Sequence, residues 1–256
     1  MSSISGINLE NNKMKIISFA NEPMKRVALN WVTHIKLLGI QNYLIYALDK
    51  ETYTFLRERK INTELRDNIW KPQGVRGKNF WDQRFKFVYS LLKSGEDILQ
   101  SDLDAVWLKN PLGLISKDCD IVASTGNMCN KGVNEKIGTS SICMGWVYFK
   151  SNNKVFDLFE EVIKLGYEEG GHTFNDQEIF NAVLFQDSQK EDIKILNKNI
   201  KRLYAKNLCI DLLSEDLIRR HKKNPQNPYI DHVFGWGQRD EKREIILKQY
   251  GLWLLD

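Results

Sequence analysis

Hydrophobic and polar positions follow two different patterns along the first half of the chain. Short apolar, β-rich runs at 13–20 and 43–48 predict buried strands. Between them, apolar residues such as Val27 and Trp31 recur at the spacing of one helical face, and Gly39 is the predicted stop. This strand–helix–strand order predicts an α/β fold, in which a mixed, mostly parallel sheet is flanked by helices.

The rest of the chain continues the same alternation. Further helices are predicted at 51–60, 80–95, 154–167, 175–186 (capped by Asn175) and 239–253, and further strands at 119–125, 144–150, 193–196 and 201–204. The stretch 96–108 is predicted as a strand that runs into a turn. Loops are expected at 70–79, 126–140 and 221–229. With no repeat and no linker, we expect a disordered segment at 1–12 and one domain over 13–256.

Composition narrows the class of protein without naming a function. Hydrophobic residues make up 42 % of the 256 residues and charged residues 27 %, which is typical of a soluble globular protein. The net charge of +4 is too small to indicate a nucleic-acid partner, although it suits a small anionic substrate. No apolar run is long enough to span a membrane, and the N-terminal segment does not resemble a signal peptide.

The four cysteines carry little information by themselves. Cys119, Cys129, Cys143 and Cys209 form no CxxC pair, and their spacing leaves disulfides open. A reduced, cytoplasmic chain is the simpler interpretation for a protein of this size.

The strongest chemical signal is a pair of aspartates inside the apolar run ILQSDLDAVWL at 98–108. Residues two apart on a strand share a face, so Asp102 and Asp104 can converge on one ion where the strand ends. Carboxylate oxygens suit hard cations such as Mg²⁺ and Mn²⁺. The alternative is a turn with two solvated aspartates, because a bare DxD is common by chance, but the apolar neighbours favour a buried site.

Four segments make a resemblance to a known group of enzymes specific. GEDILQSDLDAVWLKNPL (95–112) resembles the DxD segment of nucleotide-sugar glycosyltransferases of the GT-A fold, most closely glycosyltransferase family 77, which is kin to family 8. RFKFVYSLLKSG before it, and NDQEIFNAVL and HVFGWGQRDEKREIILKQYGLW after it, resemble family segments in the same order. Together they cover most of 80–253.

The resemblance implies a metal-dependent, retaining transferase with a Rossmann-like GT-A fold. The donor would be a nucleoside diphosphate sugar, a UDP-sugar in particular, and the acceptor a glycan or glycoprotein. Asp102, Asp104 and His232 would hold Mn²⁺ or Mg²⁺, and two acids with an imidazole suit Mn²⁺. A loop histidine with a structural role is the alternative for His232.

The resemblance also assigns the residues that would bind the donor. Arg84 and Lys86 match basic positions of the family helix, although solvated surface charges are the commoner fate of such residues. The remaining assigned donor-binding positions are Ala20 and Asn21 after the first strand, and Gly235 and Arg239 in the closing segment. Gln238 stands where related enzymes often have a lysine, which leaves the second phosphate-binding cation open.

By the same resemblance, Asp176 and Gln177 are the candidate catalytic residues. A carboxylate there would stabilise an oxocarbenium-like transition state or act as a nucleophile, and the alternative is an ordinary acidic helix N-terminus. Cys143-Met144-Gly145 replaces the family's Asn-Thr-Gly or Asn-Ala-Gly, so the identity of the sugar stays open.

Two other classes of function remain possible at this stage. One is a non-catalytic module that binds nucleotide sugars or glycans, for which Cys143 is the main argument. The other is a metal-dependent phosphoryl-transfer enzyme, which would need a further acidic cluster beside the DxD pair. The stretch 126–140 is either a lid or acceptor loop, or passive surface.

Overall fold

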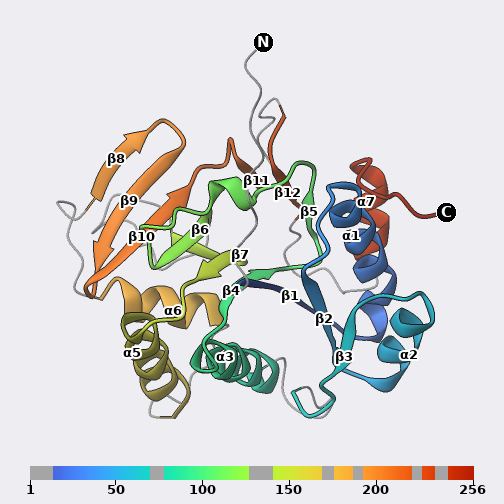
Figure 1. The fold of residues 1–256 in the computed structure, drawn as a ribbon, viewed down its shortest axis with the longest axis horizontal. Helices are drawn as coiled ribbons and strands as arrows, with labels where there is room; N and C mark the ends of the chain where they lie inside the picture. Colours follow the sequence, from blue (N-terminus) through green and yellow to red (C-terminus); the bar gives the residue numbers. More distant parts are fainter. Residues whose placement is uncertain are drawn as a thin grey trace.

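The computed structural model describes residues 14–69, 78–126, 141–168, 176–186, 193–220, 227–233 and 242–256. Within these ranges a nine-stranded sheet has the order β3-β2-β1-β4-β7-β6-β10-β9-β8 (Figure 1). Its strands are β1 (Met14–Ala20), β2 (Tyr43–Ala47), β3 (Thr63–Leu65), β4 (Asp97–Ser101), β6 (Ile121–Gly126), β7 (Ser141–Phe149), β8 (Ile193–Asn197), β9 (Ile200–Ala205) and β10 (Leu208–Leu213).

A second, three-stranded sheet stands beside the large one. It has the order β11-β12-β5, with β5 at Ala105–Trp107, β11 at Ile218–Arg220 and β12 at Ile230–His232. The helices are α1 (Lys25–Leu37), α2 (Lys50–Glu58), α3 (Lys78–Lys93), α5 (Asn153–Val162), α6 (Asp176–Leu184) and α7 (Arg243–Gln249), with short 3₁₀ turns at Glu22–Met24 and Leu112–Leu114 and a π-helical segment at Ile163–Glu168.

The large sheet is mixed but mostly parallel, as the strand and helix pattern predicts. The pairings β1 with β2, β2 with β3, β1 with β4 and β6 with β10 are parallel, whereas β7 and β9 run antiparallel to their neighbours. The first half is built by crossovers through α1 and α2, and parallel strands require such connections. The predicted fold class is therefore confirmed.

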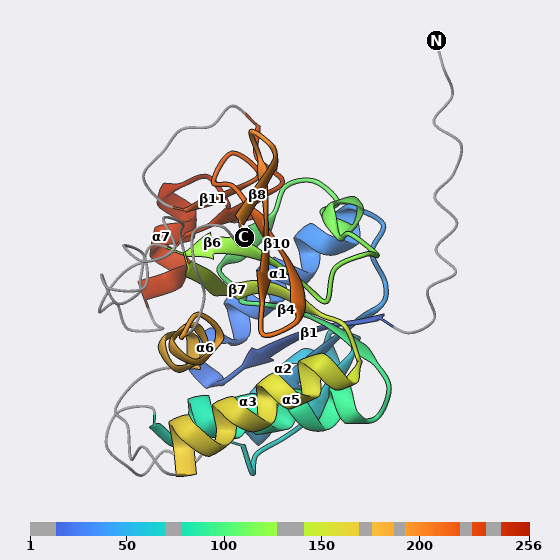
Figure 2. The same cartoon turned by 90° about the vertical axis from the view of Figure 1, so that its left-hand side faces the viewer.

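The helices cover both faces of the sheet, and each face has its own core. Neighbouring strand residues point to opposite faces, so Ile16 packs in the core with α1, α2 and α7, whereas Ile17 packs in the core with α3, α5 and α6. Figure 2 shows α3 and α5 side by side beneath the sheet. No helix among the described residues is both long and apolar enough to cross a membrane.

Several element boundaries differ from the sequence-based expectation. The closing helix is shorter than predicted, because α7 starts at Arg243 and ends before Gly251, whose φ of +67° breaks the helix. Gly39, with a φ of +76°, ends α1 as predicted. The proposed cap Asn175, most of the loop at 70–79, the loop at 127–140 and the segment 1–12 lie outside the described residues.

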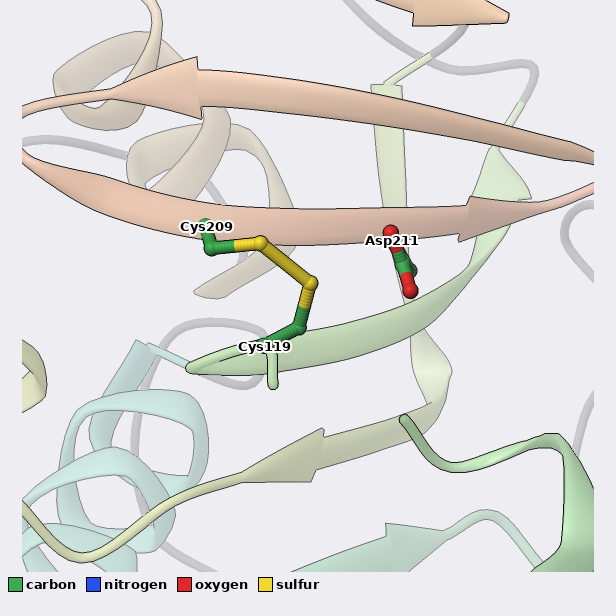
Figure 3. A group of neighbouring side chains, drawn as sticks. All are labelled: Cys119, Cys209 and Asp211. Carbon is green, nitrogen blue, oxygen red and sulfur yellow. A yellow bond between two sulfur atoms is a disulfide. The ribbon is translucent and has the colours of Figure 1, made fainter. Parts of the chain in front are cut away.

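Cys119 and Cys209 form a disulfide, which corrects the expectation of a reduced chain. Cys119 lies just before β6 and Cys209 lies on β10, and these strands are parallel neighbours, so the two Cα atoms are 4.8 Å apart (Figure 3). The sequence could not show this, because the cysteines are 90 positions apart. Asp211 is drawn beside them in Figure 3, and its carboxylate accepts hydrogen bonds of 2.8 and 2.9 Å from the guanidinium of Arg202.

Candidate functional site

The aspartate pair lies in a turn at the end of β4. The strand ends at Ser101, and the amide of Ala105 donates to the carbonyl of Asp102 across the turn at 3.1 Å. The prediction that 96–108 is a strand running into a turn is therefore confirmed, but both aspartates lie in the turn, so alternation along a strand is not what brings the two carboxylates together. The turn itself, in which Asp102 and Asp104 flank Leu103, holds them together where the chain leaves the large sheet for the small one.

The small sheet brings His232 to this turn. After the turn the chain forms β5, which pairs antiparallel with β12 so that His232 lies opposite Ala105. The amide of Val233 donates to the carbonyl of Asp104 at 3.0 Å, which fixes the end of β12 against the turn. Strand pairing thus places a histidine 128 positions downstream beside the DxD pair.

Asp102, Asp104 and His232 have the chemistry and spacing of a divalent-cation site. One ligand atom from each residue lies within 4.8 Å of the other two. Asp104 and His232 are buried, whereas the Asp102 side chain is 37 % exposed and faces the cleft. Two carboxylates and an imidazole suit Mn²⁺ or Mg²⁺, and an ion would also neutralise the closely spaced acids.

The pKa values of the three candidate ligands depend on burial and on the charged groups beside them. Burial opposes ionisation of Asp104, but His232 and Arg243 outweigh burial and lower the pKa of this carboxyl. Burial likewise disfavours the charged form of His232, yet its bond to Asp104 raises the pKa of the imidazole to about 10. Burial raises the pKa of Asp102, with Arg84 opposing the shift. Without a bound cation, protein charges therefore neutralise Asp104.

Arg84 connects the DxD turn to the start of α6. This buried side chain, on α3, bonds to the carboxylate of Asp176 through Nε (3.1 Å) and Nη2, and its Nη1 lies 3.4 Å from Asp102 Oδ1. The guanidinium also lies over the Trp81 ring, 4.5 Å from its centroid. Arg84 thereby contacts both Asp102, a predicted metal ligand, and Asp176, a predicted catalytic residue.

The N-terminal turn of α6 is attached to β7 by its own polar side chains. The amide of Met144 donates to Gln177 Oε1 at 3.1 Å, and Asn181 both accepts from and donates to the backbone of Ile142. Asp176 is only 3 % exposed and lies behind Arg84. The structure thus brings Asp176 and Gln177 close to the DxD turn, but as buried or backbone-bonded groups.

A cleft of about 250 Å³ opens beside the DxD turn. Its charged wall is formed by Arg84, Asp102, Asp104 and Arg243. A concave site with convergent polar groups is the expected form of a small-molecule site, and these charges match an anionic ligand held through a cation. His232 lies behind this wall, on the buried side of Asp104.

The other wall of the cleft is largely aromatic. Phe19, Phe80 and Trp81 line it, together with Asn21 just after β1. Ala20, the other position predicted at this turn, is buried, and its carbonyl accepts from the amide of Leu48. Of the two, Asn21 is therefore the residue that faces the cleft.

Lys86 is a predicted donor-binding residue that the structure places outside the cleft. Lys86 is a half-exposed member of an ion pair with Asp82 (3.1 Å) on α3 and is not among the cleft residues. Gly235 and Arg239 lie outside the described residues.

Three functional neighbours escaped the sequence analysis in whole or part. Arg243 Nη1 lies 3.1 Å from Asp104 Oδ2, although the mixed-charge run RDEKR at 239–243 gives no sign of which cation faces the site. Cys143 Sγ lies 3.8 Å from His232 Nδ1; burial raises the pKa of the thiol, but His232 and Arg220 outweigh burial and lower it. Gly145, noted only as a retained family glycine, packs against the His232 ring.

A comparison with known protein families places this site within a matched family region. A family model described as nucleotide-diphospho-sugar transferase matches residues 38–245. The chain belongs to this family. The match includes β4, the DxD turn, α6 and β12, so every residue of the transferase's candidate cation site lies within it.

Curated relatives of the transferase include plant glycosyltransferases. Arabinosyltransferase RRA1 of Arabidopsis thaliana is 27 % identical over 198 residues, which are 69 % of this chain and 48 % of the relative. UDP-D-xylose:L-fucose alpha-1,3-D-xylosyltransferase 1 of the same plant is 23 % identical over 194 residues, 70 % of this chain and 51 % of the relative. The chain spans about half the length of these relatives.

Solved structures confirm the GT-A fold of the transferase. The galactosyltransferase LgtC, solved in complex with donor and acceptor sugar analogues, matches 95 % of this chain and 97 % of its own with a TM-score of 0.55. The two sequences are 12 % identical, so this likeness concerns the fold. The predicted α/β architecture is thereby established.

Proposed function

We propose that the transferase moves a sugar from a UDP-sugar to a glycan or glycoprotein acceptor, with Mn²⁺ or Mg²⁺ held by Asp102, Asp104 and His232. The observation that carries the proposal is the convergence of these three ligands at a cleft whose wall also contains Arg84 and Arg243. This combination suits a diphosphate, which needs both a hard cation and guanidinium groups.

The division of labour follows from the contacts. The bound cation would stabilise the negative charge that develops on the leaving diphosphate. Arg84 adds positive charge beside Asp102, and Asp176 keeps that guanidinium in place. We assign Asp176 this positioning role, because its carboxylate lies buried behind Arg84. Gln177 holds α6 against β7 through its bond to Met144.

The cleft supports a nucleotide on its aromatic side. Phe19, Phe80 and Trp81 offer flat apolar surfaces for a base, and Asn21 offers an amide for hydrogen bonds to base or ribose. The relatives carry names of arabinosyl and xylosyl transfer, so pentoses are the first sugars to test. Retention of anomeric configuration is part of the proposal and is supported by the resemblance of the DxD and closing segments to family 77.

The test is release of nucleoside diphosphate from a panel of UDP-pentoses and UDP-hexoses, with Mn²⁺, with Mg²⁺ and with a chelator. We expect metal-dependent release that Asp104→Asn reduces by at least about a hundredfold, because the variant weakens the cation site and leaves His232 and Arg243 without their carboxylate. A matched control is Asp118→Asn, a change at an exposed residue outside the cleft.

Each other outcome points to a different function. Tight donor binding without turnover on any acceptor would indicate a binding module. Metal-dependent cleavage of phosphate esters without sugar transfer would indicate a phosphoryl-transfer enzyme. No binding of any nucleoside diphosphate would contradict the proposal outright.

A further inference from the structure

Arg243 occupies an unusual place for the first residue of a C-terminal helix. Its Nη1 lies 3.1 Å from Asp104 Oδ2 and 3.4 Å from the carbonyl of Val233, to which it donates. Its side chain is 14 % exposed and lines the same cleft as Asp102. A guanidinium therefore contacts a carboxylate that is proposed to bind a divalent cation.

The Asp104 carboxylate cannot bind a divalent cation and keep its contact with Arg243 unchanged. Its Oδ1 faces His232 Nε2 at 3.3 Å, and its Oδ2 faces Arg243. A divalent cation at this carboxylate would compete with Arg243 for Oδ2, and the two positive charges would repel each other across a few ångströms. When a cation binds, the guanidinium is expected to give up this contact while staying at the cleft wall.

We propose that Arg243 exchanges partners during donor binding: it neutralises Asp104 in the metal-free site, and it binds the donor's diphosphate once Asp104 holds the divalent cation. This inference rests on the proposed function and gives Arg243 two successive partners within it. A planar guanidinium can bind two phosphate oxygens at once, and a cation at the leaving diphosphate stabilises the charge that forms there.

Helix α7, which carries Arg243, is held in place by packing, so the exchange needs only side-chain movement. Ile246 and Leu247 of α7 are buried in the core that α1 shares. Glu244 pairs with Arg26 of α1 at 2.8 Å, which anchors the first turn of α7. A long side chain on an anchored helix can move between neighbouring anions without displacement of the fold.

Arg84, the other cleft arginine, is held differently. It is shared between Asp176 and Asp102, and its side chain is 5 % exposed. Its charge is therefore tied into a network that includes α6, whereas Arg243 pairs with the carboxylate that an incoming cation would claim. This difference makes Arg243 the cation expected to change partner.

The test uses Arg243→Gln, which keeps a polar side chain and removes the charge, with two calorimetric titrations. Mn²⁺ titrated into the metal-free protein should bind about three- to tenfold more tightly, because the competing cation is gone. In saturating Mn²⁺, the tightest binder among UDP, GDP and ADP should bind about ten- to a hundredfold more weakly, and the matching nucleoside should bind unchanged. Arg243→Lys should lie between the wild type and Arg243→Gln in both titrations.

Lys248→Gln is the matched control, because it removes a cation from the same helix at a half-exposed side chain paired with Glu244. It should change neither affinity. Circular dichroism and melting temperature verify that each variant is folded. The two opposite shifts in Arg243→Gln are the signature of the proposal, since a loosened site would weaken both ligands.

Failure of this inference is distinguishable from failure of the proposed function. If the wild type binds Mn²⁺ and a nucleoside diphosphate, but Arg243→Gln binds both as the wild type does or weakens both alike, the partner exchange is wrong and the proposed function stands. If the wild type binds no nucleoside diphosphate, both are overturned.

Discussion

The imidazole of His232 lies directly against the backbone of Gly145. A Cβ atom at position 145 would come within 2.9 Å of both ring nitrogens and closer still to Cε1. The glycine backbone is tied to the DxD turn, because the Gly145 carbonyl accepts from the amide of Asp102 at 2.8 Å, at the place where the register of β7 with β6 shifts. The absence of a side chain at 145 is thus a condition for the position of His232.

Gly145→Ala should displace His232 and weaken the cation site. We expect Mn²⁺ affinity to fall by about ten- to a hundredfold, the range seen when the support of a metal ligand is lost. Electron paramagnetic resonance of free Mn²⁺ measures this directly. An unchanged affinity would show that His232 is not a ligand or that the ring adjusts without loss.

Two comparisons isolate the cause of that loss. Gly113→Ala adds the same methyl group where nothing lies within 4 Å of the new Cβ, so it should leave Mn²⁺ binding intact. In a His232→Ala background, Gly145→Ala should have almost no further effect, because the atoms it would collide with are gone.

Arg84→Ala should destabilise the fold as well as the site. It leaves the buried carboxylate of Asp176 without its cation, and breaking one side of a buried ion pair typically costs about 3–5 kcal/mol. Urea denaturation gives the free energy of unfolding. Lys86→Ala, which removes the half-exposed pair with Asp82 on the same helix, should cost less than about 1 kcal/mol. Equal losses in the two variants would contradict the structure.

Reduction of the Cys119–Cys209 disulfide should lower stability by about 2–4 kcal/mol, because the bond closes a long loop in the unfolded chain. Dithiothreitol should lower the denaturation midpoint of the wild type and leave that of a Cys119→Ala/Cys209→Ala variant unchanged. Thiol titration of the unfolded protein should find two additional thiols after reduction. No gain in thiols would show that the bond does not form.

His34 should make the fold sensitive to mild acid. Burial lowers the pKa of His34 below its ordinary 6.5, and Nε2 lies 3.1 Å from the carbonyl of Leu252. The folded protein thus favours the neutral ring, so this contribution is complete above about pH 6.5 and is lost as the pH falls below that value. Denaturation midpoints between pH 8 and 5 should fall less steeply in His34→Gln than in the wild type, and parallel profiles would refute the assignment.

Local patterns predicted the elements well and their long-range contacts poorly. Strand and helix periodicity depends on neighbouring residues, so β1, α1 and the stop at Gly39 were accessible from sequence. A turn after β4 was predicted too, but its position at Asp102–Ala105 was not, and no local pattern indicated that the apolar residues after it belong to a second sheet. Asp102 and Asp104 were predicted correctly to lie together, but the turn holds them together and not the alternation of side chains along a strand.

The site residues that depend on long-range contacts were likewise harder to predict than those with a local signal. His232 was found only because a family resemblance supplied it, since the β5–β12 pairing leaves no local trace. Arg243 was missed because the start of the last helix was placed four residues too early, at 239, which hid the basic residue that faces the cleft. The contact between Cys143 and His232 joins residues 89 positions apart and has no signal in either segment.

The positions of the site residues along the chain determine when each is synthesised. All nine strands of the large sheet lie before residue 214, whereas His232 and Arg243 come after it. A ribosome has therefore made every strand of the main scaffold before it makes the third cation ligand. A chain that ended after β10 would contain Asp102 and Asp104 but would lack His232 and Arg243, as well as Ile246 and Leu247 of the core beside α1, so its cation site would be incomplete.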